Sequence, residues 1–161
     1  MLRSIAIQAV IFFLIFQTAS WLRERSMIPT STSLSQMSTK LPTIMGDEIE
    51  LQAKGKTTII YFFAPWCQIC HASISNLQAI YQRNEDIDVI AVGLDYTDPK
   101  EIEKFTQKHQ LTFPIALGNQ ATKKVFQITA YPSYYVLDGE NTIVGKSLGY
   151  SSELGLYLRS L

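Results

Sequence analysis

The sequence predicts an α/β fold, in which a central mixed β-sheet is flanked by helices. Two runs rich in β-branched and aromatic residues, Thr57 to Phe63 and Ile87 to Leu94, predict buried strands, and each precedes a segment with helical periodicity. A third strand, Ser133 to Leu137, is joined to another by the turn Asp138-Gly139, which adds an antiparallel pair. This alternation extends over about 120 residues, which is the size of one domain with one core.

The first half of the predicted domain contains a hairpin and two helices. The hairpin is expected within 43–51, around the turn Gly46-Asp47. Asp98 and Pro99 have the residue types of an N-cap and a first helical position, and they predict a helix that ends near His109. The helix after the first strand should present an apolar face made of Ile74, Leu77, Ile80 and Tyr81.

The second half of the domain completes the sheet. The segment 111–114 precedes a short strand, which is followed by a helix through Val125. Thr142 to Ser147 is the expected hairpin partner of the strand that ends at Leu137. Ser151 is expected to open a last helix, with Leu154 and Leu158 on one face.

The only two cysteines of the chain, Cys67 and Cys70, directly follow the first buried strand and can close a disulfide. If a helix begins at Gln68, Cys67 lies at its N-terminus, where unpaired N–H groups and the helix dipole favour a thiolate. Cys70 then lies one turn further along and can attack a mixed disulfide formed at Cys67. We therefore predict a redox pair in which Cys67 is the nucleophile and Cys70 the resolving thiol.

Other interpretations of the two cysteines remain open. A purely structural disulfide would close a very short loop and remove little entropy from the unfolded chain. Structural zinc needs four ligands, and His71 and His109 are the only histidines, so no metal is expected. Residues 67–71 also match the c-type haem pattern C-x-x-C-H, with His109 as the remaining distal ligand because the methionines lie upstream, at Met1, Met27, Met37 and Met45. No cofactor beyond the Cys67–Cys70 disulfide is expected, and His109 is interpreted as a packed last-turn histidine.

The N-terminal segment 1–22 is predicted to be a membrane anchor. From Ser4 to Leu22 there are nineteen residues without a formal charge. At about 1.5 Å per residue this stretch just crosses a hydrocarbon core of about 30 Å. The alternative is a cleaved signal peptide, with the small residues Thr18 and Ser20 before Trp21 as its cleavage signal.

Residues 23–40 are predicted to form a flexible tether, and residues 41–161 the folded domain. Between Ser26 and Thr39, eight of fourteen residues are Ser or Thr, with almost no apolar periodicity. The formal net charge of the chain is zero and there is no basic tract, so nucleic acid is not an expected partner.

Four segments of the chain resemble the thioredoxin superfamily in order and spacing: 62–70, 92–95, 111–114 and 130–139. They contain the tryptophan-flanked Trp66-Cys67-Gln68-Ile69-Cys70 and the downstream Tyr131-Pro132. The resemblance implies a three-layer thioredoxin-like fold over nearly the whole domain. The extra helix and strand before the proline segment, together with the anchor, resemble TlpA/ResA/DsbE-type membrane-tethered disulfide oxidoreductases, including the copper-sensitivity-suppressor branch.

The resemblance assigns a role to each residue of a partner site. Pro132 would be the family's cis-proline beside the dithiol, the Tyr131 backbone would pair with an extended partner segment, and Trp66 would line the binding surface. Gln68 and Ile69 would tune the reduction potential, which follows the stability of the Cys67 thiolate, and they leave the direction of electron transfer open.

The implied activity is thiol:disulfide exchange with protein dithiols or disulfides, supported by a membrane electron donor or acceptor. The expected form is a monomer with one span in the inner (cytoplasmic) membrane and its catalytic domain in the periplasm. Two further classes stay open beside c-type haem. One is a non-catalytic thioredoxin-fold chaperone or assembly module, and the other is a peroxidase, since redoxin relatives share the fold but usually have a different cysteine context.

The chain departs from the family at two positions that bear on proton transfer. Many relatives keep an aspartate six residues before the first cysteine, where this chain has Tyr61. Several keep a glutamate three residues after the second cysteine, where this chain has Ser73. The usual carboxylate bases for Cys70 are therefore missing, and the sequence identifies no replacement.

Overall fold

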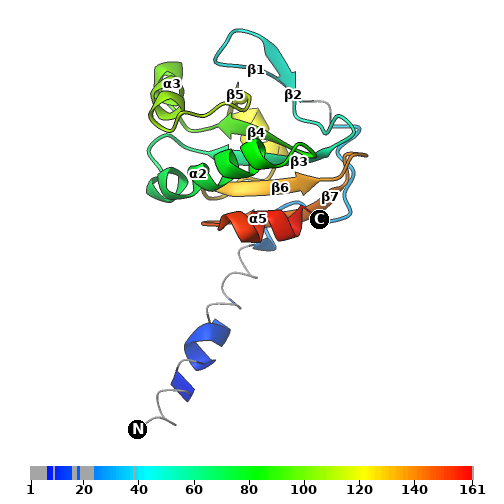
Figure 1. The fold of residues 1–161 in the computed structure, drawn as a ribbon, viewed down its shortest axis with the longest axis vertical. Coiled ribbons are helices and arrows are strands. Elements are labelled where there is room, and N and C mark those ends of the chain that lie inside the picture. Colours follow the sequence, from blue (N-terminus) through cyan, green and yellow to red (C-terminus); the bar gives the residue numbers. More distant parts are fainter. Residues whose placement is uncertain (1–6, 9, 16–17, 19–23, 38, 161) are drawn as a thin grey trace.

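A computed structural model of the chain describes residues 7–8, 10–15, 18, 24–37 and 39–160. At its centre lies a five-stranded sheet with the order β5-β4-β3-β6-β7 (Figure 1). The central strand β3 (Thr57–Phe63) pairs in parallel with β4 (Ile87–Gly93) and antiparallel with β6 (Ser133–Leu137). β5 (Ile115–Leu117) extends the sheet beyond β4, and β7 (Ile143–Leu148) extends it beyond β6. The predicted mixed sheet is confirmed.

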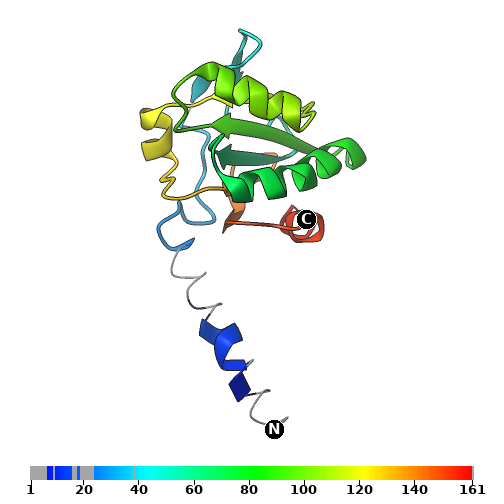
Figure 2. The same ribbon diagram turned by 90° about the vertical axis from the view of Figure 1, so that its left-hand side faces the viewer.

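Helices pack on this sheet, and a small separate sheet lies beside it (Figures 1 and 2). The helices are α2 (Gln68–Arg83), α3 (Pro99–Lys108), α4 (Gln120–Val125) and α5 (Glu153–Arg159). The small antiparallel sheet consists of β1 (Lys40–Pro42) and β2 (Glu48–Glu50), so its first strand begins earlier than the predicted hairpin.

The alternation of side chains along β3 divides the core into two clusters. Ile59, Tyr61 and Phe63 face one side, where they pack with buried residues of α2, α3 and α5. Ile60 and Phe62 face the other side. Because both faces are covered, every residue of β3 after Thr57 is buried, which explains why the strand is an unbroken apolar run in the sequence.

The last helix differs from its prediction. Its N-cap is Ser152 rather than Ser151, since the Ser152 side chain accepts the N–H of Gly155. Leu154 and Leu158 do share a face, but that face is exposed, and Leu156 is the residue that the core buries. A helix of seven residues has too few turns for its sequence periodicity to reveal the buried side.

The predicted tether is wrong for residues 24–37, because this segment packs on the domain. Met27, Ile28 and Leu34 are buried in the second core cluster, with Leu34 fully inaccessible. The Leu34 N–H donates to the Asn141 carbonyl at 2.8 Å. Three aperiodic apolar residues in a Ser/Thr-rich stretch are enough to hold it, because they join the core cluster that contains Ile60 and Phe62 of β3.

The predicted anchor falls largely outside the described residues. Residues 7–8 and 10–15 are helical, with exposed apolar side chains such as Phe12. Among the residues that the structure describes, no helix has both the length and the apolar character to cross a membrane.

We predict that Leu34→Ala destabilises the domain by about 2–3 kcal/mol, because it deletes a fully buried side chain. Urea unfolding of the variant and the wild type measures this loss. Met45→Ala is the matched control, since Met45 is 87% exposed. A flexible tether would instead give both variants the same stability.

Candidate active site

The two cysteines lie where β3 leads into α2. Cys67 is the N-cap residue of α2, and its Sγ accepts the N–H of Cys70 at 3.2 Å. The two residues form a disulfide, with their Cα atoms 5.2 Å apart. Cys70 is fully buried, whereas Cys67 is 7% exposed, so Cys67 offers the more accessible sulfur but is itself well covered. The expected placement of both thiols at a helix N-terminus is confirmed.

An aromatic rim, formed by Trp66 and Tyr131, adjoins the disulfide. The Tyr131-Pro132 peptide bond is cis, as the resemblance implied, and it precedes β6, whose Ser133 pairs with Phe62 of β3. The Trp66 ring meets the Tyr131 ring edge-on at 5.9 Å between centroids. Trp66 is 61% exposed and Ile69 is 49% exposed, and Gln68 is also exposed. The predicted binding residues are thus brought to the edge of the sheet at which β3 ends.

Asp95 holds this rim in place, and sequence reasoning did not assign it a role. Its backbone carbonyl accepts the Trp66 indole N–H at 3.0 Å. Its carboxylate accepts the Tyr131 hydroxyl at 2.9 Å, the Gln120 amide at 3.0 Å and the Lys123 ammonium group. Burial raises the pKa of Asp95, but the hydrogen bonds outweigh burial and leave this pKa below its ordinary value. Asp95 therefore anchors both rings, Tyr131 through its charged carboxylate and Trp66 through its backbone carbonyl.

Tyr61 and Ser73, which replace the carboxylates of relatives, are hydrogen-bonded to each other. Their hydroxyl oxygens are 2.8 Å apart, and both side chains are buried. Burial raises the pKa of Tyr61 well above its ordinary value, although the bond to Ser73 lowers it slightly. The pair is therefore neutral at physiological pH and cannot take up a proton as a carboxylate would.

The two histidines of the chain also contact each other beside the disulfide. His71 Nδ1 lies 2.7 Å from His109 Nε2, and His71 Nε2 lies 3.0 Å from the Pro65 carbonyl oxygen. The Phe105 ring packs against both imidazoles in a tilted arrangement, with centroids 4.6 Å from His71 and 4.8 Å from His109. The sequence placed His71 near the thiols and His109 at a helix end, but nothing in it indicated contact across 38 positions.

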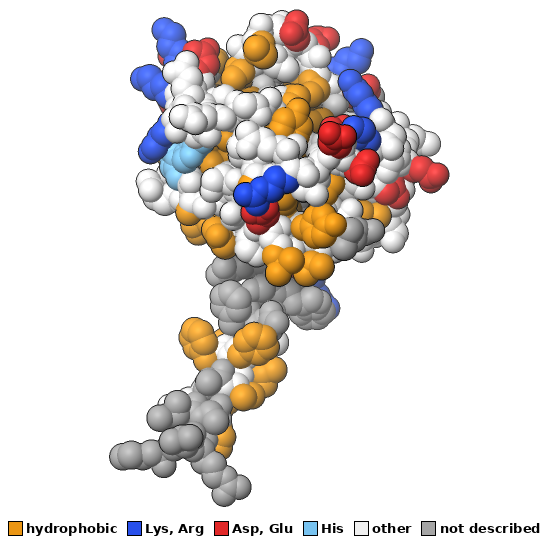
Figure 3. All heavy atoms as spheres, in the orientation of Figure 1, with side chains coloured by type: hydrophobic (Ala, Val, Ile, Leu, Met, Phe, Trp, Pro, Cys, Tyr) orange, Lys and Arg blue, Asp and Glu red, His pale blue; other side chains and the backbone are white. Residues whose placement is uncertain are grey.

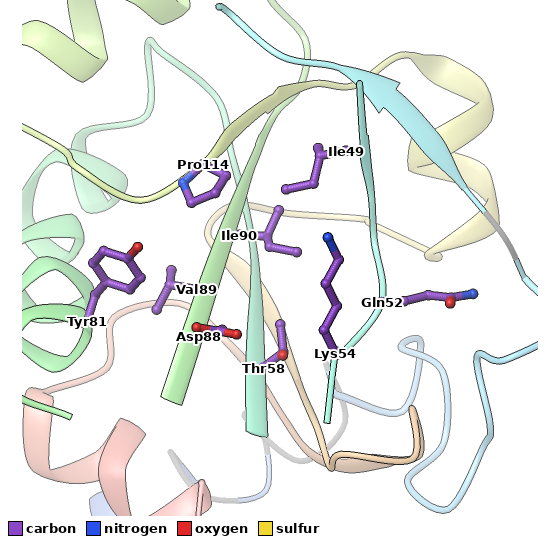
Figure 4. Close-up of a pocket in the computed structure, with 9 residues that line it drawn as sticks. All are labelled: Ile49, Gln52, Lys54, Thr58, Tyr81, Asp88, Val89, Ile90 and Pro114. Atoms are coloured by element: carbon purple, nitrogen blue, oxygen red, sulfur yellow. The ribbon is translucent and has the colours of Figure 1, made fainter. Parts of the chain in front are cut away.

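A separate pocket lies under the β1–β2 hairpin (Figure 4). It has a volume of about 150 Å³, and the Lys54 side chain extends along it toward Ile90. Its lining contains none of the predicted site residues: Ile49, Gln52, Lys54, Thr58, Tyr81, Asp88, Val89, Ile90 and Pro114. This pocket is thus distinct from the disulfide site.

The sheet order, the disulfide at the start of α2 and the neighbouring cis-proline together define a thioredoxin-fold protein with a CxxC redox pair. The match to a family model extends over residues 36–146. The chain belongs to the AhpC/TSA family.

Named relatives support the same class. The chain is 29% identical over 107 residues to the thioredoxin-like protein YneN of Bacillus subtilis, covering 64% of this chain and 63% of that protein. It is 26% identical over 114 residues to the sporulation thiol-disulfide oxidoreductase A of the same species, covering 68% and 69%. The crystal structure of StoA from Bacillus subtilis has the same fold, with a TM-score of 0.68 and 24% identity, covering 76% of this chain and 96% of that one.

We predict that Ser73→Glu speeds the attack of Cys70 on a mixed disulfide between about pH 6 and 8. Ser73 lies one helical turn after Cys70 and is 2% exposed, so burial would raise the pKa of a new carboxyl group toward neutrality. A rapid-quench measurement of mixed-disulfide lifetime against pH tests this.

Ser73→Gln is the control for this prediction, since it has the same size but cannot take up a proton. Equal lifetimes in the two variants, or a wild-type lifetime that does not change with pH, would refute the hypothesis that Cys70 lacks a base.

Proposed function

We propose that the chain is a thiol:disulfide oxidoreductase that exchanges electrons with protein dithiols or disulfides. The observation that carries this proposal is the Cys67–Cys70 disulfide at the N-terminus of α2, with only Cys67 reachable from solvent. The relatives with thiol-disulfide oxidoreductase names support it.

The proposed reaction has two steps that balance in thiols and electrons. In the reducing direction, the Cys67 thiolate attacks one sulfur of a partner disulfide, and the other partner sulfur leaves as a thiolate. Cys70 then loses its proton and attacks Cys67 Sγ, which releases the second partner sulfur and closes the Cys67–Cys70 disulfide. Two electrons pass to the partner. The same steps in reverse oxidise a dithiol.

The N-cap position supplies the chemistry that the first step needs. The first turn of α2 directs backbone N–H groups toward Cys67 Sγ, and the Cys70 N–H already bonds to it in the disulfide state. These donors and the helix dipole favour a thiolate at Cys67. Gln68 and Ile69 lie within this turn, so we propose that they tune the reduction potential.

The partner site in this proposal is the aromatic rim. Trp66 and Ile69 offer exposed apolar surface on the two sides of Cys67, and Tyr131 precedes the cis-proline Pro132. An extended partner segment would pair with the Tyr131 backbone as an added strand and place its cysteine over Cys67. The bonds from Asp95 fix this surface in advance of binding.

The site favours this chemistry over a c-type haem. Cys70 is sealed in the core, whereas both thiols must reach the porphyrin to attach it. Both ring nitrogens of His71 are engaged, one by Pro65 and the other by His109, so neither offers a lone pair to iron. An absorption spectrum without a Soret band is the expected result.

We further propose that residues 1–22 anchor a monomeric domain to the inner membrane, with the site in the periplasm and a membrane protein as electron partner. The nineteen uncharged residues of the N-terminal segment support this location. Packed residues 24–37 then hold the domain close to the point where the anchor ends.

For the reduced protein, a limiting amount of iodoacetamide at neutral pH should label Cys67 much faster than Cys70, because only Cys67 is accessible. Peptide mass spectrometry reads the ratio. Cys70→Ala should accumulate mixed disulfides with partners, and Cys67→Ala should trap few. Preferential labelling of Cys70 would exchange the two roles. Partner maturation that persists in Cys67→Ala would indicate a non-catalytic module, and thiol-dependent peroxide consumption would indicate a peroxidase.

The membrane proposal predicts that the full-length chain stays in the membrane fraction after washing at alkaline pH. A reporter that is active only outside the cytoplasm, fused after Leu161, should be active. Activity of a cytoplasmic reporter would refute the location. Release of a form that begins near Trp21 would show that the segment is a signal peptide.

A further inference from the structure

The two histidines beside the disulfide are held in one hydrogen-bond arrangement. The Pro65 carbonyl oxygen can only accept, so His71 Nε2 must carry a hydrogen. In neutral His71 the other nitrogen, Nδ1, is then an acceptor, and the hydrogen between the two rings belongs to His109 Nε2. The geometry therefore fixes the neutral tautomer of both rings.

The same geometry lets the pair hold one added proton but not two. Two imidazolium rings would place two N–H groups against each other across 2.7 Å and break the bond. One proton can enter without breaking it. It binds Nδ1 of His109, and the hydrogen on His109 Nε2 moves across to His71 Nδ1. One proton is taken from solvent, and the positive charge ends on His71.

His71 is the ring that lies against the nucleophile's segment. The backbone N–H of His71 donates to the Cys67 carbonyl at 3.1 Å, and the His71 ring bonds to the carbonyl of Pro65, two residues before Cys67. His71 follows Cys67 by four residues, about one helical turn, so a charge on its ring lies on the same side of the start of α2 as Cys67. A nearby imidazolium stabilises a thiolate.

We propose that His71 and His109 form a proton relay that places one positive charge beside Cys67 under acid conditions. This inference rests on the proposed role of Cys67 as the nucleophile. His109 takes up the proton at the end of α3, and His71 positions the charge. In this scheme neither histidine bonds to the partner.

The groups around the two histidines set the pH range in which the relay takes up its proton. The groove beside His71 is lined by Pro65, Trp66 and Phe105 and by the charged residues Glu101, Lys104 and Lys108 of α3. Burial lowers the pKa of His109, and repulsion from His71 and Lys108 lowers it further. His109 is only partly buried, so solvent can deliver the proton to it. Figure 3 shows a histidine side chain at the surface beside basic side chains.

The sign of the effect follows from these positions. Below its pKa, Cys67 loses thiolate as the pH falls, while the relay gains its proton over the acid range and lowers the pKa of Cys67. The two changes oppose each other. As the pH falls, the reactivity of Cys67 should thus decrease less steeply than that of a thiol whose pKa stays constant.

The test is the rate of Cys67 alkylation by iodoacetamide between pH 5 and 9 in the full-length reduced protein. His71→Gln keeps an amide donor for the Pro65 carbonyl but cannot hold the positive charge. We expect its rate to equal the wild-type rate near pH 8.5 and to be about threefold to tenfold lower near pH 5.5. Lys108→Gln is the matched control, because it removes a neighbouring charge but keeps the hydrogen bond between the rings. Its profile should keep the wild-type shape and move toward higher pH, because Lys108 lowers the pKa of His109.

Coinciding profiles in wild type and His71→Gln, or an equal loss in Lys108→Gln, would overturn the relay. Preferential labelling of Cys70 would instead refute the proposed role of Cys67, so the two failures are distinguishable. Nitrogen-15 spectra of the wild-type imidazoles give a check that needs no variant. Both rings should be Nε2–H tautomers at pH 8, and an Nδ1–H tautomer at His71 would also overturn the proposal.

Discussion

The hydrogen bond from the Cys70 N–H to Cys67 Sγ joins the chemistry of this protein to its fold. It exists because a sulfur occupies the N-cap position of α2, where other helices place a side-chain oxygen. The position of that cap depends in turn on β3, which is paired on both edges and buried on both faces. A rigid strand end thus fixes the start of the helix, and the helix start fixes the electrostatics of the first thiol.

Several elements of the fold meet at the point where β3 leads into α2. β6 brings the cis-proline beside it through its pairing with β3, and the end of β4 brings Asp95, which ties Trp66 to Tyr131. The end of α3 brings His109 to His71. The site is therefore assembled from the ends of secondary-structure elements, where side chains are free to face a partner while the backbone is held by the sheet.

Among the described residues, the core below the disulfide holds hydroxyl groups and no buried carboxylate. Tyr61 and Ser73 satisfy each other's hydroxyl groups in a space where an unpaired charge would be costly. Charged and titratable groups lie instead at the surface side of the site, in Asp95, Lys123 and the two histidines. Such a distribution keeps the core neutral and leaves proton exchange to groups that solvent can reach.

The sequence by itself determined the local features of the protein. The apolar runs located β3, β4 and β6 to within a residue, and the spacing of Cys67 and Cys70 after β3 located the redox pair. These features depend on neighbours along the chain, through strand and helix periodicity and through capping. The cis-proline followed from a resemblance that also depends on local motifs.

Only the tertiary structure decided which distant residues meet. Nothing in the order of residues indicated that Leu34 would be buried or that Leu158 would not, because each depends on which elements pack against one another in the folded domain. The contacts of His71 with His109, of Asp95 with Tyr131 and of Tyr61 with Ser73 join different elements. They arise from the packing of whole elements against one another, and no local propensity encodes that packing.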